Sequence, residues 1–214
     1  AVANYPTYDA NNARQEKPRL WRNRAVADLF EPGSTQKVFT VAAALDKGFS
    51  KNQVFAYCTG KEKLGGGKIP CLLHHPYEHG HGAVTMSLII RESCNIGAAH
   101  VALRLGDANF YHYEEAFGLT KKVNAGFGSE AVGWIRKPGH IRKLELANSG
   151  FGQGLAVTPL HMAAGYCVIA NGGKYMQPQV IREIRGRDGS VYEKFQKKSL
   201  RTVISKEAAD DVTD

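Results

Sequence analysis

Residues 31–37 read EPGSTQK and place Ser34 and Lys37 in the pattern S-x-x-K. The pattern follows a proline and a glycine, and it opens an apolar-rich stretch that continues to Leu45 and stops at Gly48. These start and stop signals predict a largely buried helix that begins at Ser34. A spacing of three residues then puts the Ser34 hydroxyl and the Lys37 amine on one face of the helix.

That arrangement suits nucleophilic catalysis. A serine hydroxyl is a weak nucleophile unless a base takes its proton, and a lysine is such a base when burial and its neighbours keep it neutral. The start of a helix also favours negative charge that develops nearby. The pattern is common by chance, however, and the simpler interpretation, that Ser34 only caps its helix, stays open.

A second pattern, S-x-N, is formed by Ser93, Cys94 and Asn95. It lies between a predicted helix over 86–92 and another over 96–105. A second hydroxyl near a serine and lysine pair can relay a proton to a leaving amine, and an asparagine carboxamide can hold both the lysine and a substrate amide. The alternative is that Ser93 and Asn95 merely cap a helix.

Local signals predict the other elements. Residues 9–28 are polar and predict a loop, and residues 51–84 are rich in glycine, histidine and proline, which indicates irregular structure with at most short strands. The remaining predictions are helices from Asp107 to Phe117, from Pro159 to Ala170 with Thr158 as cap, and after Ser205, and a β-hairpin over 180–184 and 191–195.

The composition limits the class of protein. With 214 residues, 43% of them hydrophobic, the chain can bury the core of one domain or of two small ones. Its formal charge of +8 comes from basic residues that alternate with acidic ones, so we expect no nucleic-acid partner. The longest apolar run is far shorter than the roughly 20 residues of a membrane span, and residues 1–8 do not resemble a signal peptide.

Further short motifs surround the two patterns in a fixed order. They are YPTYD at 5–9, the stretch 23–26, EPGSTQK at 31–37, SCNIG at 93–97, FGQG at 151–154, VTPL at 157–160 and IANGG at 169–173. In these motifs the chain resembles the class B penicillin-binding proteins of bacteria. The resemblance implies an α+β fold shared with the serine β-lactamases, of which residues 1–214 would hold mainly the helical subdomain.

The same resemblance implies a peptidoglycan D,D-transpeptidase that is acylated by β-lactams and needs no cofactor for catalysis. Ser34 would attack the penultimate D-Ala of a stem peptide, Lys37 would act as general base, Ser93 would pass protons, and Asn95 would orient Lys37 and the substrate. The oxyanion would be held by the backbone N–H of Ser34 and a second N–H on a β-strand. A membrane glycosyltransferase partner and a place on the extracytoplasmic face of the membrane are also implied.

The third motif of that family, K-T-G, does not occur in the sequence. We therefore expect residues 1–214 to be a partial transpeptidase domain, with the N-terminal pedestal, the membrane anchor and the K-T-G strand outside it, and to acylate poorly alone. Two other functions stay open. One is a β-lactamase or D,D-carboxypeptidase on the same fold, and the other is a non-catalytic penicillin-binding scaffold.

Three cysteines and one histidine form a candidate zinc site: Cys58, Cys71, His81 and Cys94. Thiolates and imidazole are the ligands of structural zinc, and some elongation-type members of the family are similar here and bind zinc. His74, His75 or His79 could replace one cysteine. A disulfide between Cys58 and Cys71 or unpaired thiols are the alternatives, and Cys167 is expected in the core.

Overall fold

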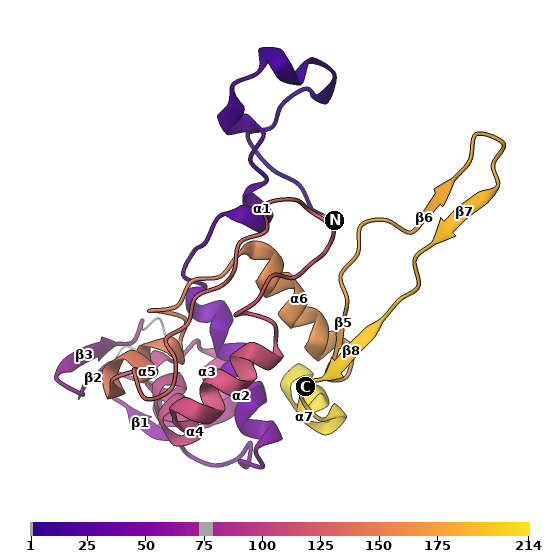
Figure 1. Ribbon diagram of the computed structural model, residues 1–214. Coiled ribbons are helices and arrows are strands. Elements are labelled where there is room, and N and C mark those ends of the chain that lie inside the picture. Colours follow the sequence, from indigo (N-terminus) through magenta and orange to yellow (C-terminus); the bar gives the residue numbers. More distant parts are fainter. Residues whose placement is uncertain (1, 73–78) are drawn as a thin grey trace.

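The computed structural model describes residues 2–72 and 79–214, and its body is built from helices (Figure 1). Helix α2 lies within this body and packs against α4 and α7. The helices of the body are α2 (Lys37–Asp46), α3 (Met86–Arg91), α4 (Asn95–Ala116), α5 (Lys143–Ser149), α6 (Pro159–Ala170) and α7 (Lys206–Thr213). None of the helices in the described ranges is both long enough and apolar enough to cross a membrane.

The helix predicted from Ser34 is present, and its first turn is tighter than expected. A 3-10 turn over Gly33–Gln36 leads directly into α2. Seven of the ten residues of α2 are buried. The Phe39 ring packs against Phe117, with 4.9 Å between ring centroids, and against Tyr166 at 5.1 Å. Such aromatic packing fixes α2 against its neighbours.

The helices on either side of the S-x-N pattern form as predicted. Thr85 caps α3 by accepting a hydrogen bond from the backbone N–H of Leu88. Helix α4 runs through both helices that were predicted over 96–105 and from Asp107, but Gly106 breaks it with a φ of 75° and a ψ of 162°. The left-handed φ is one that glycine adopts without strain. The helix is therefore interrupted at Gly106, where its end was predicted, and then continues.

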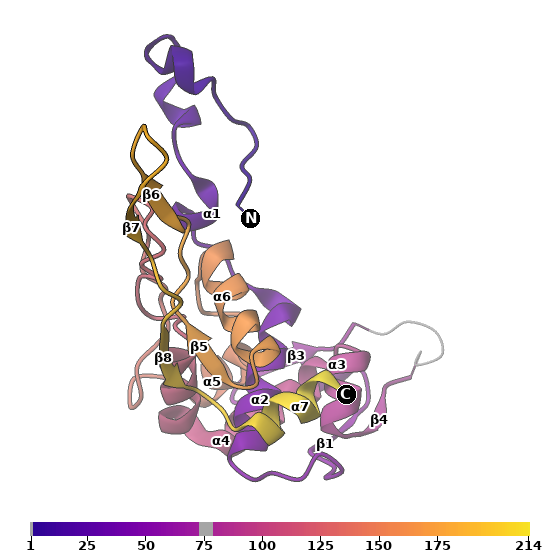
Figure 2. The ribbon, with the colours of Figure 1, turned by 90° about the vertical axis from the view of Figure 1, so that its right-hand side faces the viewer.

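The strands form antiparallel pairs rather than one large sheet in the described part of the chain. The predicted hairpin is present and extends beyond the helical body (Figures 1 and 2). The pairs are β1 (Ala56–Cys58) with β4 (Gly82–Val84), β2 (Lys61–Leu64) with β3 (Gly67–Pro70), β5 (Lys174–Met176) with β8 (Ser199–Thr202), and β6 (Glu183–Arg185) with β7 (Val191–Lys194). The mixture of helices and paired strands agrees with the predicted α+β class.

Three local predictions differ from the structure. Residues 9–28 contain 3-10 helices at Ala10–Gln15 and Pro18–Leu20 and the short α1 (Arg24–Ala27), because the Asp9 carboxylate accepts a hydrogen bond from the Asn11 backbone and starts a turn. Helix α5 was not predicted, since Arg142 stands where a short polar cap is usual. Cys167 is exposed, because positions 163, 166, 167 and 170 form the solvent face of α6.

Candidate active site

The side chains of Ser34, Lys37 and Ser93 meet at the start of α2. Lys37 Nζ lies 3.0 Å from Ser34 Oγ and 2.8 Å from Ser93 Oγ, and it donates a hydrogen bond of 2.6 Å to the backbone carbonyl of Ser93. Ser93 Oγ is 2.9 Å from Ser34 Oγ. Every pair among the two hydroxyls and the amine is therefore within proton-transfer reach.

The environment of Lys37 favours its neutral form. The side chain is 1% exposed, whereas Ser34 at the same helix start is exposed to solvent. Burial lowers the pKa of Lys37 to about 8, against the opposing electrostatic effect of the Cys71 and Cys94 side chains. Burial disfavours the ammonium ion because it removes the water that solvates the charge. An exposed hydroxyl thus stands beside a buried amine that can lose its proton near neutral pH.

The backbone around Ser34 is held by the F-G-Q-G motif. The backbone N–H of Gly33 donates to the carbonyl of Gly152 at 3.0 Å. Both glycines have positive φ, and a Cβ on Gly152 would lie 2.1 Å from the Gly33 carbonyl oxygen. Only glycine permits this approach. The motif at 151–154 therefore supports the turn that presents Ser34, a contact that the sequence patterns alone did not predict.

The backbone at Ser93 adopts a conformation that is uncommon for serine. Its φ is 54°, in the left-handed region, and residues other than glycine in this region cost roughly 1–3 kcal/mol. The turn directs both the hydroxyl and the carbonyl of Ser93 at Lys37. This carbonyl is a partner of Lys37 that the S-x-N pattern does not reveal, because any residue has one.

Asn95 lies beside this group, but its contacts differ from those implied for it. Its carboxamide Nδ2 donates to the carbonyl of Pro70 at 2.9 Å. Across the described residues, no hydrogen bond joins Asn95 to Lys37, whose third partner is the Ser93 carbonyl. The role of Asn95 toward Lys37 and the substrate therefore stays a prediction.

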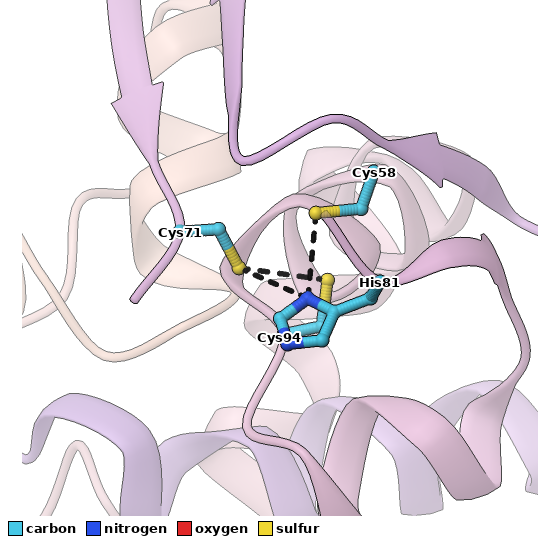
Figure 3. Close-up of side chains that lie close together, drawn as sticks. All are labelled: Cys58, Cys71, His81 and Cys94. Carbon is cyan, nitrogen blue, oxygen red and sulfur yellow. Dashed lines mark hydrogen bonds between the residues drawn. The ribbon is translucent and has the colours of Figure 1, made fainter. Parts of the chain in front are cut away.

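The four predicted zinc ligands come together in one buried cluster next to the S-x-N turn (Figure 3). Their ligand atoms all lie within 4.8 Å of one another. Cys58 comes from β1, Cys71 follows β3, His81 precedes β4 and Cys94 caps α4. Of the histidines that could have replaced a cysteine, His79 is exposed and is not one of the four, while His74 and His75 lie outside the described residues.

Three of the six distances between ligand atoms in the cluster match the edges of a tetrahedral zinc site. Zinc bonds of about 2.3 Å to sulfur and about 2.05 Å to nitrogen give tetrahedral edges of about 3.8 Å between two sulfurs and about 3.6 Å between sulfur and nitrogen. The observed separations are 3.7 Å from Cys71 Sγ to Cys94 Sγ, and 3.4 and 3.5 Å from His81 Nδ1 to Cys58 Sγ and Cys71 Sγ. Cys58 and Cys71 are free thiols in the structure, which therefore does not contain the alternative disulfide between them.

Backbone N–H groups support the sulfur atoms. Gly60, Asn95 and Gly97 donate to Cys58, Cys71 and Cys94, respectively, over 3.3–3.5 Å. Hydrogen bonds of this kind stabilise thiolates and orient metal ligands. The hydrogen bond between the Cys71 and Cys94 sulfurs, together with the backbone donors, lowers the pKa of Cys71, and the same pairing together with burial raises the pKa of Cys94.

The cluster and the candidate catalytic group share their backbone. Cys94 stands between Ser93 and Asn95 in the chain, and the Asn95 N–H donates to Cys71 Sγ at 3.3 Å. Any group that binds the sulfur atoms would therefore also fix the turn that carries the Ser93 hydroxyl. The sequence signal for this link was the cysteine inside S-x-N.

Comparison with known proteins identifies the class to which this fold and site belong. The model of the penicillin-binding protein transpeptidase domain matches residues 1–214. The chain therefore belongs to the penicillin-binding protein transpeptidase family, as the motifs predicted.

Individual relatives agree with this membership. The chain is 31% identical over 210 residues to the penicillin-binding protein PbpB of Mycolicibacterium smegmatis, which covers 98% of the chain and 32% of PbpB. It is 32% identical over 176 residues to the peptidoglycan D,D-transpeptidase FtsI of Escherichia coli, covering 82% of the chain and 29% of FtsI. The chain thus spans about a third of the length of these curated relatives.

Solved structures confirm the predicted fold. The apo form of penicillin-binding protein 3 from Mycobacterium tuberculosis superposes with a TM-score of 0.80 at 27% identity, over 96% of this chain and 44% of that protein. The transpeptidase domain of penicillin-binding protein 3 from Burkholderia pseudomallei gives 0.75 at 29% identity, over 89% and 54%.

Proposed function

We propose that the protein is a peptidoglycan D,D-transpeptidase in which Ser34 forms the acyl-enzyme. The observation that carries the proposal is the contact of the exposed Ser34 hydroxyl with the buried Lys37 amine and the Ser93 hydroxyl. Family membership supports it, and so does the name of the Escherichia coli relative, a peptidoglycan D,D-transpeptidase.

In this reaction, neutral Lys37 takes the proton of Ser34 as its oxygen attacks the carbonyl of the penultimate D-Ala. The bond to the terminal D-Ala then breaks, and Ser93, within 2.9 Å of Ser34, passes a proton to the leaving amine. The amine of a neighbouring stem peptide finally attacks the ester on Ser34 and forms the cross-link; the bond between the acyl group and Ser34 Oγ breaks, and a proton from the amine returns to Ser34 through Lys37 and Ser93. The start of the helix stabilises the negative charge that develops at the carbonyl oxygen.

The proposal extends to the surroundings of the protein. Stem peptides of peptidoglycan are the substrates and β-lactams the inhibitors, which places the site on the extracytoplasmic face of the bacterial membrane. A membrane glycosyltransferase that polymerises the glycan strands is the proposed partner. The K-T-G strand, which is absent from these 214 residues, would supply the second oxyanion donor from elsewhere in the complete polypeptide.

Labelling with a fluorescent penicillin tests the function. In the complete polypeptide that contains this chain, we expect one label, on the peptide with Ser34, and none in Ser34→Ala. Ser87→Ala, which changes an exposed serine on α3, should label like the wild type. Failure of the wild type to label would indicate a non-catalytic scaffold, and rapid release of the label to water would indicate a β-lactamase or carboxypeptidase.

The rate of acylation should depend on pH through Lys37. The amine must be neutral to accept a proton, and its pKa is lowered to about 8. Raising the pH from 6 to 7 is therefore expected to speed acylation about ninefold, and raising it from 7 to 8 by about a further fivefold, as the fraction of neutral lysine grows. Stopped-flow measurement of acylation over this range checks the prediction, and a flat profile would contradict the role of Lys37 as base.

We further propose that Cys58, Cys71, His81 and Cys94 bind a structural zinc ion. Their burial in one cluster and the three ligand–ligand distances of 3.4–3.7 Å, which match tetrahedral edges, support the proposal. Four protein ligands leave no open position, so such an ion braces the fold and takes no part in bond breaking. Its effect on the reaction would be to hold Ser93 and Asn95, which flank Cys94.

A further inference from the structure

Glu114 is a buried carboxyl group on α4 that the proposed reaction does not use. The residue is 1% exposed, and its Oε1 accepts a hydrogen bond of 2.5 Å from Nε2 of Gln36, which is 0% exposed. Gln36 stands between Ser34 and Lys37 in the S-x-x-K pattern. A polar pair thus lies in the core directly behind the candidate catalytic group.

Each of the two side chains has one oxygen atom without a hydrogen-bond partner in the described part of the chain, and protonation of Glu114 would make one of these oxygens a donor for the other. Among the described residues, neither Glu114 Oε2 nor Gln36 Oε1 has a hydrogen-bond partner. A carboxylic acid carries a donor on one oxygen, which is what the free Gln36 oxygen lacks. Burial raises the pKa of Glu114 to about 8, with the Gln36 hydrogen bond opposing the shift, and no charged group on any described element contributes. At neutral pH the pair is therefore a neutral acid facing an amide.

The pair joins α4 to the turn that starts α2. Residues on a helix are about 100° apart, so Gln36 points to a different side from Ser34 and Lys37. Residues at both ends of α4 contact the start of α2. Ser93, just before α4, contacts Lys37. Glu114, near the end of α4, contacts Gln36. A rotation of about 10° would move an atom about 6 Å from the helix axis by about 1 Å.

We propose that Glu114 is a positioning residue that acts through Gln36 to fix the rotation of α2, and so the contact between Ser34 and Lys37. The proposal rests on the proposed acylation of Ser34. Misplacement of reacting groups by about 1 Å can cost about 100-fold in rate. The pair supplies a directional hydrogen bond, which apolar packing at the same place would not.

The test compares acylation by a fluorescent penicillin among variants of the complete polypeptide. Glu114→Ala is expected to lower the limiting acylation rate about 10- to 100-fold while the apparent dissociation constant of the penicillin changes little. Glu114→Gln keeps two complementary amide groups and should stay within about twofold of the wild type at pH 7. Glu115→Ala is the matched control and should be unaffected: Glu115 is also on α4, and its carboxylate pairs with Lys121, which follows the helix.

A double variant separates positioning from stability. Replacing both partners by apolar residues of similar length, in Gln36→Met with Glu114→Met, should leave the melting temperature close to that of the wild type. We expect its acylation rate to stay low. Recovery of the wild-type rate in this variant would overturn the positioning role, whereas loss of acylation in the wild type itself would refute the proposed function.

The pH dependence of stability gives an independent readout. The unfolded chain loses the Glu114 proton near pH 4.5 and the folded chain near 8. The folded state therefore binds more protons between these values, and its stability falls as the pH rises from 4.5 to 8. The melting temperature of Glu114→Gln should accordingly rise relative to the wild type over this range, and a constant difference would show that Glu114 is not held as the acid.

Discussion

Lys37→Met is expected to slow acylation of Ser34 by about 10²–10⁴-fold, the usual effect of losing a general base. Methionine has nearly the volume of lysine and no group that can accept a proton. Because Lys37 is 1% exposed, methionine fills its buried site, but the Ser93 carbonyl loses its partner, so we expect only a small loss of thermal stability. Stopped-flow acylation and the melting temperature, measured on the same preparation, check both parts.

Lys122→Met provides the matched control, since Lys122 is exposed and makes no side-chain contact with the catalytic group. Its acylation rate should equal that of the wild type. A slow rate in Lys37→Met that is accompanied by a large drop in melting temperature would mean that Lys37 matters for folding. An unchanged rate would mean that another group takes the proton from Ser34.

Loss of the proposed zinc ion is expected to have the second large effect. Cys71→Ser should reduce the zinc content from about one ion per chain to nearly none. If free zinc exceeds its dissociation constant by about 1,000-fold, bound zinc stabilises the folded state by about 4 kcal/mol. For a domain of this size that corresponds to a fall in melting temperature of roughly 8–16 °C. Acylation should slow as well, because the Asn95 backbone loses its sulfur acceptor.

Elemental analysis and thermal melts with and without a chelator measure this effect. Cys167→Ser is the control, because Cys167 is an exposed thiol on α6 outside the cluster. It should keep its zinc and its melting temperature. If wild-type protein from zinc-supplemented cells carries no metal and melts identically with a chelator, the zinc proposal is wrong.

Much of the site could be predicted because its signals are local. The helix start at Ser34, the caps at Thr85 and Thr158 and the glycine at 106 each act on a few neighbouring residues, and the structure has all four. The four candidate zinc ligands were also predicted, since cysteine and histidine are uncommon residues with few roles. Their convergence in one buried cluster follows the prediction.

Features that depend on distant parts of the chain could not be predicted in this way. The pairing of Lys174 with Thr202 joins segments separated by the whole β6–β7 hairpin, and short strands carry little periodicity. The Gln36–Glu114 pair joins residues 78 positions apart, and a lone glutamate on a helix is usually a surface residue. The hydrogen bond from Lys37 to the Ser93 carbonyl could not be predicted, because every residue has a backbone carbonyl.

The left-handed backbone at Ser93 has a consequence for the evolution of the family. Glycine at this position would relieve the strain and make the fold more stable, but it would delete the hydroxyl that lies beside Ser34 and Lys37. Selection for stability alone would therefore favour glycine at position 93, and we expect serine to be kept only where its hydroxyl takes part in the reaction. A paralogue with glycine here and an intact S-x-x-K would have kept the architecture after abandoning the chemistry.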